Sequence, residues 1–383
     1  MFFFIHDVTY RELIEKPMIQ KIVDEKYQFI TMFNPETGAY VRTGILNQYG
    51  WDSGVDPFQA SFPHLIDVGI MGHCTHGKTG LCIKAGVGCY QSGLTKSEPN
   101  MSVDDFTHIA VQCRGRVNQF ALGGRGDPDQ HENFEEILST CCENDIVPNF
   151  TTSGFGLTKE LAAISKQYCG AVAVSWYRND YTHKAIQILL EAGVKTNIHY
   201  ILGNNSIDEA ITRLESDDFP QGINGIVFLL HKPVGLGSHD NVLLVNDERV
   251  NKFFNLVDRG KRRFKVGIDS CSVPGIINGC KNYIPEAIET CEGARFSCYI
   301  DSKLTMTPCS FDQMKRYGIS LRNMSIEQAW NSNDFNQFRN VLHAQCPNCA
   351  KRIDCMGGCP LLPEIVLCEE FANLKLKKDK HEN

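Results

Sequence analysis

The segment MGHCTHGKTGLCIKAGVGCYQSG (residues 71–93) carries three cysteines, Cys74, Cys82 and Cys89, among six glycines. It follows directly on HLIDVGIM (residues 64–71), a short apolar run of the kind that forms a buried strand. Glycine-rich sequence offers little side-chain surface to bury, so packing does not explain three thiols in one loop. The segment therefore predicts a strand followed by a loop whose cysteines serve a chemical purpose.

From residue 65 to about residue 270 the chain alternates between strand-like and helix-like segments. A strand followed by a helix, repeated about every 30 residues, predicts parallel strands joined by right-handed crossovers. Six or seven such units fit a full or partial α/β barrel, whose chemistry lies on the loops after the strands. The cysteine loop follows the first strand and is in that position. The strand-like runs are residues 65–71, 118–122, 148–152, 170–176, 196–202, 225–230 and 264–269.

The two ends of the chain depart from this alternation. Residues 1–60 are a mixed extension in which FNPETGAYVRTG (residues 33–44) indicates a hairpin. Residues 271–383 are rich in cysteine and contain one clear helix at 325–338, which starts with a capping-box sequence. We therefore predict an N-terminal extension, a barrel over residues 61–270, and a small cysteine-rich domain.

The composition is that of a globular protein in a reducing compartment. The 383 residues, 42% hydrophobic and 22% charged, allow one large core and a smaller module. A net charge of -7 gives no electrostatic footprint for nucleic acid. The sequence shows no run of about 18 apolar residues and no basic segment before its apolar start, so we expect neither a membrane span nor a signal peptide. Seventeen cysteines in such a chain favour metal binding in the cytoplasm over disulfides.

The C-terminal cysteines have the most specific spacing in the chain. CPNCAKRIDCMGGC (residues 346–359) is a C-x2-C-x5-C-x3-C run. With the cysteines on either side it supplies enough thiolates for two sites of four ligands each. Structural zinc and iron–sulfur clusters both fit such spacing. The eight cysteines are Cys291, Cys298, Cys309, Cys346, Cys349, Cys355, Cys359 and Cys368.

The three cysteines of the first loop favour iron over zinc. Zinc sites with three protein ligands are usually rich in histidine. A four-iron cluster held by only three thiolates keeps one iron open for a substrate or cofactor. We therefore interpret Cys74, Cys82 and Cys89 as ligands of a [4Fe–4S] cluster.

With these motifs the chain resembles radical S-adenosylmethionine (SAM) enzymes that carry a SPASM-type C-terminal extension. The resemblance covers residues 60–370 and implies a partial (β/α)6 barrel followed by a small iron–sulfur domain. The C-terminal cysteine spacing matches the SPASM pattern. Three barrel segments and one helix also resemble the family: FALGGRGDPDQHENFEEIL (120–138), FTTSGFGLT (150–158), AVAVSW (171–176) and SIEQAWNSNDFNQFR (325–339).

Two features depart from the family pattern. The first loop is C-x7-C-x6-C, whereas the usual triad is C-x3-C-x2-C. The second-strand Gly-Gly-Glu-Pro segment lacks its glutamate and reads GGRGDP, with Gly123 and Gly124 followed by Arg125 or Asp127. The resemblance implies that Gly123, Gly124 and Asp127 contact SAM, although Arg125 is an alternative to Asp127.

Other barrel residues are candidates for contacts with SAM or substrate. The resemblance implies that Ser175 contacts the ribose of SAM. Arg178 is a candidate for the methionine carboxylate of SAM, the alternative being a surface arginine. His231 and Lys232 follow the sixth strand and could face the substrate, although Lys232 could equally be a charge on the rim.

The resemblance also implies how the cluster ligands are shared. It gives three [4Fe–4S] clusters, one that binds SAM and two auxiliary clusters. Leu304 stands where the family usually has a glycine. One auxiliary cluster takes Cys291, Cys298, Cys309 and Cys359, and the other takes Cys346, Cys349, Cys355 and Cys368.

The six remaining cysteines divide into two groups. Cys271 and Cys280 follow the last barrel strand and could be alternative cluster ligands, a working thiol or packing residues; Cys271 is the candidate for a catalytic thiol. The others lie on helical patterns and are expected to pack as small hydrophobic residues. They are Cys113, Cys141, Cys142 and Cys169.

The resemblance implies reductive cleavage of SAM to a 5'-deoxyadenosyl radical and oxidative modification of a peptide or protein side chain, such as a crosslink or thioether. An electron donor such as flavodoxin or ferredoxin is then needed. Ser310 stands where the sulfatase-maturing branch has an aspartate, which argues against that activity. Residues 1–60 are too short for a winged-helix leader-recognition domain, so the hairpin or an edge strand could capture a peptide. The alternatives are a radical SAM enzyme for a small metabolite and a zinc-binding module without enzymatic activity.

Overall fold

The structure, a computed structural model, describes residues 3–4, 19–76 and 80–373. Its centre is a sheet of eleven strands in the order β1-β11-β10-β9-β8-β7-β6-β5-β12-β13-β14. The strands from β5 to β11 run parallel to their neighbours, where the apolar runs predict them, so the predicted barrel is confirmed. They are β5 (Leu65–Met71), β6 (Gln119–Gly124), β7 (Val147–Thr152), β8 (Ala171–Ser175), β9 (Thr196–Leu202), β10 (Gly225–Leu230) and β11 (Lys265–Ile268).

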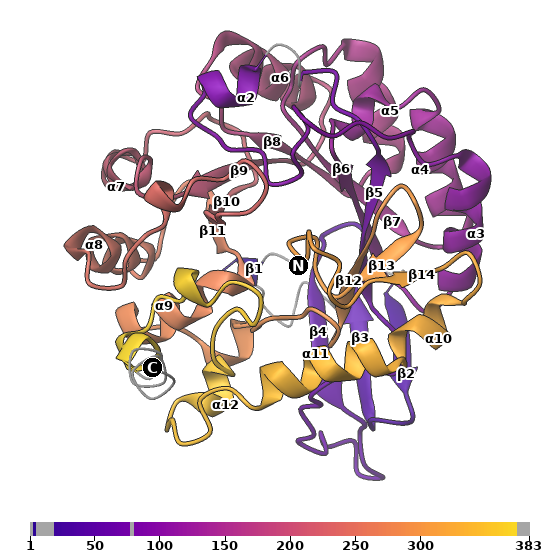
Figure 1. The fold of residues 1–383 in the computed structure, drawn as a ribbon, viewed down its shortest axis with the longest axis vertical. Coiled ribbons are helices and arrows are strands. Elements are labelled where there is room, and N and C mark those ends of the chain that lie inside the picture. The colour runs from indigo at the N-terminus through magenta and orange to yellow at the C-terminus, as the bar shows by residue number, and fades with distance from the viewer. Residues whose placement is uncertain (1–2, 5–18, 77–79, 374–383) are drawn as a thin grey trace.

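Helices alternate with these strands and form an arc along the outer side of the sheet (Figure 1). Several begin at a polar residue, Ser102, Thr158, Asn179 or Asp247, whose side chain accepts a hydrogen bond from a backbone N–H of the first turn. Within the described ranges, no helix combines the length and the apolar character needed to cross a membrane. The helices are α3 (Val103–Cys113), α4 (Phe134–Glu143), α5 (Lys159–Tyr168), α6 (Asp180–Glu191), α7 (Ile207–Ser216) and α8 (Glu248–Val257).

The two faces of the sheet have different surroundings, as β9 shows. Ile198 and Tyr200 are fully buried in the hydrophobic core with the helices. Asn197 and His199, which alternate with them, line a cavity inside the barrel. Side chains in a strand point alternately to opposite faces, so the outer face holds the core and the inner face forms the cavity wall.

The C-terminal region continues the barrel sheet. Strand β12 (Ser297–Ile300) pairs in parallel with β5 and is followed by β13 (Thr305–Thr307) and β14 (Ile319–Ser320). The predicted helix at 325–338 is two helices, because Ser332 caps a new first turn. The capping box between Ser325 and Gln328 is present. The helices of this region are α9 (Val273–Gly279), α10 (Ile326–Trp330), α11 (Asn333–His343) and α12 (Arg352–Cys355).

The N-terminal extension forms a separate antiparallel sheet of β2 (Gln20–Asp24), β3 (Phe29–Phe33) and β4 (Tyr40–Gly44). The predicted hairpin is the turn between β3 and β4. Phe29 packs against Phe296, directly before β12, with ring centroids 6.2 Å apart. The extension is therefore joined to the start of the C-terminal region. The short β1 (Phe3–Phe4) pairs antiparallel with β11.

Candidate functional site: thiols around a barrel cavity

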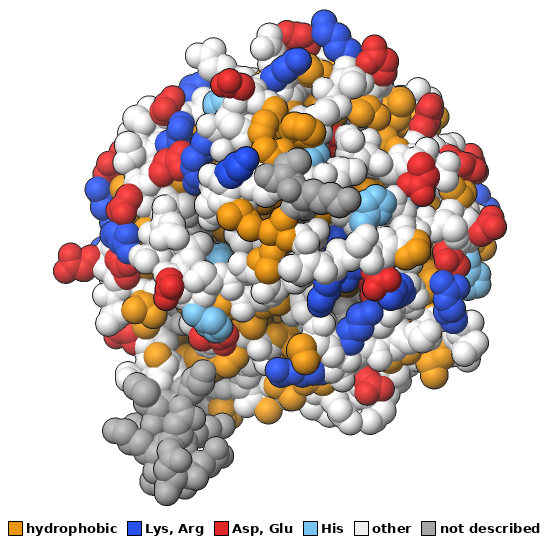
Figure 2. Space-filling view, turned by 45° about the horizontal axis from the view of Figure 1, so that its top comes forward, with side chains coloured by type: hydrophobic (Ala, Val, Ile, Leu, Met, Phe, Trp, Pro, Cys, Tyr) orange, Lys and Arg blue, Asp and Glu red, His pale blue; other side chains and the backbone are white. Residues whose placement is uncertain are grey.

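The barrel encloses a cavity of about 1400 Å³. Its wall includes the inner side chains of the parallel strands and the loops at their carboxyl ends. Figure 2 turns the α2 end of the molecule forward, and hydrophobic side chains gather in the centre of this face. The cysteines that line the cavity come from both ends of the sequence. They are Cys74, Cys82, Cys89, Cys271, Cys291, Cys298, Cys309 and Cys359.

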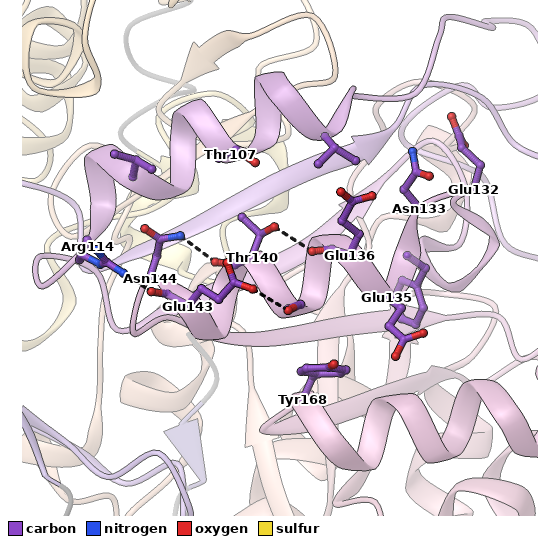
Figure 3. A pocket seen from close by; sticks show the side chains of 14 residues that line it. Thr107, Arg114, Glu132, Asn133, Glu135, Glu136, Thr140, Glu143, Asn144 and Tyr168 are labelled. Atoms are coloured by element: carbon purple, nitrogen blue, oxygen red, sulfur yellow. Dashed lines mark hydrogen bonds between the residues drawn. The ribbon is translucent and has the colours of Figure 1, made fainter.

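A second hollow of about 850 Å³ lies on the outer surface beside α3 and α4 (Figure 3). Several of its polar groups bond within α4: Thr140 donates to Glu136 O at 2.8 Å, and Asn144 donates to Thr140 O at 2.8 Å. The described residues that line it include no cysteine or histidine. The barrel cavity is therefore the better candidate for a metal or cofactor site.

The first cysteine loop is folded so that its thiols approach one another. Cys82 lies on the short helix α2 (Leu81–Lys84). A Cβ atom built on Gly93 would lie 2.9 Å from the Cβ of Cys74 and 3.6 Å from the Sγ of Cys89. The backbone N–H of Gly93 donates to the Sγ of Cys89 at 3.4 Å. A residue without a side chain at position 93 thus lets the first and third cysteines meet.

Electrostatic interactions link all three thiols. Burial raises the pKa of Cys74 to about 11, and Cys82, Asp127 and Cys89 add to this effect. Burial also raises the pKa of Cys82, although a hydrogen bond with Tyr177 opposes the rise. Buried thiols that raise one another's pKa stay protonated at neutral pH unless a cation replaces the proton. The loop therefore does not hold a free thiolate, and its three thiols lie near enough to influence one another.

The GGRGDP segment after β6 packs directly on this loop. A Cβ at Gly124, whose φ is 119°, would lie 2.3 Å from the carbonyl oxygen of Met71. A Cβ at Gly126 would lie 3.3 Å from the Cα of Cys74. Arg125 donates from its Nη1 to the carbonyl oxygen of Gly72 at 3.2 Å. Because Gly124 and Gly126 have no side chains, this segment can approach the backbone of the cysteine loop closely. The hydrogen bond from Arg125 also joins the segment to that loop.

Asp127 is fixed beside the cluster loop at the cavity wall. Its Oδ1 accepts from the backbone N–H of Ser153 at 2.9 Å. Its Oδ2 lies 3.0 Å from the Nε2 of His76. Gly123 and Gly124 also line the cavity. Of the two alternatives, only Asp127 can accept from an ammonium group, because the guanidinium of Arg125 has donors only and its positive charge would repel the ammonium.

Ser175 and Arg178 differ in their relation to the cavity. Ser175 ends β8 and lines the cavity. Arg178 forms an ion pair with Glu209 on α7 and donates to the hydroxyl of Tyr200 at 3.3 Å. It is not among the described residues that line the cavity. The structure therefore favours the alternative of a surface arginine, because the guanidinium of Arg178 already has partners outside the cavity.

The second group of thiols differs by one member from the predicted set. Cys271 forms a hydrogen bond with Cys359, and this bond and burial raise its pKa well above the usual value. Burial raises the pKa of Cys291 to about 12, with Cys271 as the next cause. Burial likewise raises the pKa of Cys309, with Cys271 and Cys291 contributing. The structure thus brings together Cys271, Cys291, Cys309 and Cys359.

Cys298, predicted in place of Cys271, has other neighbours. It lies in β12, is 1% exposed and belongs to the same hydrophobic core as Cys113 of α3. Burial raises its pKa well above the usual value, and Cys113 and Asp67 are the next causes. Although Cys298 borders the cavity, it is in register with the core residue Ile66 of β5, so its side chain points toward the helix layer, which spacing along the sequence does not show.

Cys280, the other cysteine after the barrel, is a packing residue. It is 7% exposed and donates from its thiol to the carbonyl oxygen of Phe254 at 3.5 Å. Cys113 and Cys141 are also buried in the hydrophobic core. Cys280 is therefore distinct from Cys271, which bonds to another thiol at the cavity wall.

The third group of thiols lies nearer the surface. Burial raises the pKa of Cys355 to about 11, and Cys368, Cys346 and Cys349 add to the rise. The thiol of Cys349 donates to the carboxylate of Glu370 at 3.7 Å. These four cysteines therefore influence one another as a set. They lie in the segment that runs from just before α12 to Cys368.

The three groups contain three, four and four thiols. Within the described ranges, no three His, Cys, Asp or Glu side chains already form a site for a single metal ion. Thiolates are the ligands of iron–sulfur clusters, and three or four of them per group is the donor set that such clusters need. The residues present therefore fit iron–sulfur clusters.

Sequence reasoning missed two residues at this site. Tyr177 is half-buried, and its hydroxyl bonds to Cys82 and Ser175. Asp269 follows β11 and lines the cavity as the partner of Lys232. Both stand just after the carboxyl end of a barrel strand, which is the only signal in the sequence that could have indicated them.

The comparisons with known proteins agree with this geometry. A family model described as SPASM, an iron–sulfur cluster-binding domain, matches residues 291–356. A search among curated proteins gives no sequence match. SuiB of Streptococcus suis bound to S-adenosylmethionine is similar over 79% of this chain and 74% of its own, with a TM-score of 0.60 and 16% identity.

Two solved complexes with peptides are also similar. SuiB bound to the precursor peptide SuiA matches over 79% of this chain and 72% of its own, with a TM-score of 0.60 and 15% identity. The protein anSMEcpe with bound AdoMet and Cp18Cys peptide matches over 82% of this chain and 95% of its own, with a TM-score of 0.57 and 17% identity. The chain therefore has the fold of radical SAM enzymes and carries a SPASM iron–sulfur cluster-binding domain in its C-terminal part.

Proposed function

We propose that this protein is a radical SAM enzyme that oxidatively modifies a peptide or protein side chain. The observation that carries the proposal is the barrel cavity, whose wall includes both the cysteines of the first loop and the second thiol group. Substrate in this cavity would lie between the site of SAM cleavage and an electron acceptor. The product we propose is a crosslink, a thioether or a related oxidised side chain.

The chain's own residues have separate tasks in this proposal. Cys74, Cys82 and Cys89 would hold the cluster that, with SAM bound, supplies a 5'-deoxyadenosyl radical for hydrogen abstraction. Asp127, fixed by Ser153, would accept hydrogen bonds from the ammonium group of SAM. The enclosed barrel would exclude water from the radical.

Additional SAM contacts would come from the neighbouring strand ends. The backbone at Gly123 and Gly124 would lie against the methionine part of SAM, since neither residue has a side chain to block it. Ser175 would bond to the ribose, and Tyr177 would hold Cys82 and Ser175 in place.

We propose two auxiliary clusters, which gives three [4Fe–4S] clusters in all. Four thiols at the cavity would hold the first, with Cys271 as a ligand in place of Cys298, so that Cys271 is a ligand and not a free catalytic thiol. The more exposed group would hold the second. Their role would be to take up the electron that the substrate loses. The two sets are Cys271, Cys291, Cys309 and Cys359, and Cys346, Cys349, Cys355 and Cys368.

A peptide substrate is supported by the similar structures. SuiB is solved with its precursor peptide SuiA, and anSMEcpe is solved with the Cp18Cys peptide. The aromatic tip of the extension, with Tyr49 76% and Trp51 72% exposed, is available for peptide contacts near the cavity-lining strand β4. We further propose a flavodoxin or ferredoxin as electron donor and, because thiolate ligands require reducing conditions, a cytoplasmic location.

The test is cluster content and SAM cleavage. Anaerobically reconstituted protein should hold about twelve iron atoms per chain, four for each cluster. It should form 5'-deoxyadenosine from SAM when dithionite is added. Replacement of Cys74, Cys82 and Cys89 by alanine should remove about four iron atoms and abolish 5'-deoxyadenosine, because no SAM-binding cluster can form.

A matched variant separates the clusters. Replacement of Cys349 and Cys355 by alanine should also remove iron but leave some SAM cleavage. If the first triple variant still forms 5'-deoxyadenosine, or if the purified protein is colourless with zinc and no sulfide, the proposal is wrong. Mass analysis with candidate peptides and with small metabolites then distinguishes the two substrate classes.

A further inference from the structure

A buried ion pair lies in the cavity wall and has no role in the function proposed above. Lys232 follows β10 and Asp269 follows β11, and both line the cavity. The Nζ of Lys232 bonds to the Oδ2 of Asp269, and the two side chains are 6% and 8% exposed. A buried pair of this kind adds little net stability, because both charges lose their hydration. Its presence therefore calls for another explanation.

The pair is held rigidly. Asp269 also accepts from the backbone N–H of Leu230 at 3.1 Å and from the hydroxyl of Ser272 at 2.8 Å. The Nζ of Lys232 lies 4.8 Å from the centroid of the Phe311 ring. The carboxylate thus has three donors, and the ammonium is fixed between a carboxylate and an aromatic face. Neither charge is free to turn toward solvent.

The position of the ammonium places it next to the second thiol group. Asp269 precedes Cys271 by two residues, and Phe311 follows Cys309 by two residues. The charge of Lys232 interacts with both thiols: it opposes the rise in the pKa of Cys271, and Cys271 and Cys309 help to raise the pKa of Lys232. The ammonium of Lys232 is therefore held between the two segments that carry Cys271 and Cys309.

A cluster with four thiolate ligands is an anion, and the thiols of this group are surrounded by protein. Negative charge in such an interior is costly unless a cation lies nearby. Arg295 supplies one cation, since its Nη1 donates to the carbonyl oxygen of Cys291 at 3.2 Å. Lys232, which follows β10, supplies a second cation. The third thiol group instead has the carboxylate of Glu370 beside Cys349.

We propose that Lys232, held by Asp269, is a positioning residue that sets the reduction potential of the auxiliary cluster at Cys271, Cys291, Cys309 and Cys359. The inference rests on the proposed function. Reduction makes the cluster more negative, so a fixed cation stabilises the reduced form and raises the potential. The carboxylate of Asp269 has the opposite sign of effect, and it holds the cation in place.

The experiment is a redox titration of the reconstituted holoenzyme, followed by electron paramagnetic resonance. Lys232→Gln should shift the potential of the buried auxiliary cluster to a more negative value, because the cation is lost. Asp269→Asn should shift it to a more positive value, because the cation loses its neutralising partner. The double variant should return close to the wild-type potential, and Lys232→Arg should retain it.

Two controls show whether the effect is local. The exposed auxiliary cluster in the same molecule should keep its potential in every variant. Lys252→Gln removes a surface lysine that pairs with Glu215 at 2.9 Å and should leave both potentials unchanged. A merely structural role for the pair would lower the iron content or the unfolding temperature without shifts of opposite sign.

The outcomes separate this inference from the proposed function. A wild-type protein without iron–sulfur clusters overturns both, and one that cleaves SAM but lacks the cluster at Cys271, Cys291, Cys309 and Cys359 overturns only the role of Lys232. Two auxiliary clusters whose potentials stay the same in Lys232→Gln and Asp269→Asn, or shift in the same direction, overturn only the role of Lys232. If Lys232→Gln fails to retain iron, Asp269→Asn and the double variant give the same test of sign.

Discussion

Two cysteines, Cys271 and Cys298, have different surroundings, and these decide their chemistry. Cys271 shares a hydrogen bond with Cys359 at the cavity. Cys298 lies in the hydrophobic core of the sheet with Cys113. A thiol among other thiols can exchange its proton for iron, whereas a thiol among apolar side chains serves as a small hydrophobic group. The assignment of a ligand at this scale depends on strand orientation more than on spacing along the chain.

Single alanine substitutions at these two positions test the assignment. Cys271→Ala should lose about four iron atoms per chain, because the buried auxiliary cluster lacks a ligand. Cys298→Ala should keep its iron and lower the free energy of unfolding by about 1 kcal/mol, because a buried sulfur is removed from the core. Iron analysis and denaturant unfolding measure the two effects. The reverse pattern of iron loss would restore Cys298 as the ligand.

The strand-to-helix loops are the elements that assemble the site, and Gly124 shows how closely they pack. Its φ of 119° and the 2.3 Å approach of a Cβ to Met71 O leave no room for a side chain. Gly124→Ala should therefore displace the cysteine loop and lower both the unfolding temperature and the iron content of the SAM-binding cluster. Gly123→Ala is the matched control for folding, since a Cβ there meets nothing within 4 Å. Equal unfolding temperatures for the two variants would show that the loop contact is dispensable.

The helices and strands are largely predictable from the sequence, whereas the contacts between them are not. Short β-rich runs predict the seven parallel strands, because the outward side chains of each strand must be apolar to pack against the helices. Capping chemistry gives the helix starts, including Ser325, but the second cap at Ser332 divides one predicted helix into two. The pair of Lys232 and Asp269 joins the ends of two strands, and the partnership depends on how the loops after β10 and β11 turn. Such contacts follow from the assembled sheet and have no local pattern.

At the scale of the whole molecule, the barrel and the cysteine-rich region share one sheet. Strand β12 pairs with β5, with Cys298 opposite Ile66 in the register. Trp330 of α10 is fully buried and donates to the carbonyl oxygen of Ala60 at 2.9 Å, which ties the C-terminal helices to the segment before the barrel. The two regions are therefore expected to unfold together, although their boundary at residue 271 rests on sequence alone.

Removal of the clusters tests this coupling. Clusters bind the folded chain and not the unfolded chain, so their removal by a chelator under reducing conditions should lower the unfolding temperature of the whole protein. Because β12 completes the sheet beside β5, the loss of barrel helicity and the loss of C-terminal aromatic signals should coincide in one transition, in both the loaded and the stripped protein. Circular dichroism in the far ultraviolet follows the helices, and the fluorescence of Trp330, isolated by Trp51→Phe and Trp176→Phe, follows the C-terminal region. A stripped protein whose aromatic signal is lost well below the temperature of helix loss would show that the cysteine-rich region folds on its clusters alone, and that the shared sheet does not couple it to the barrel.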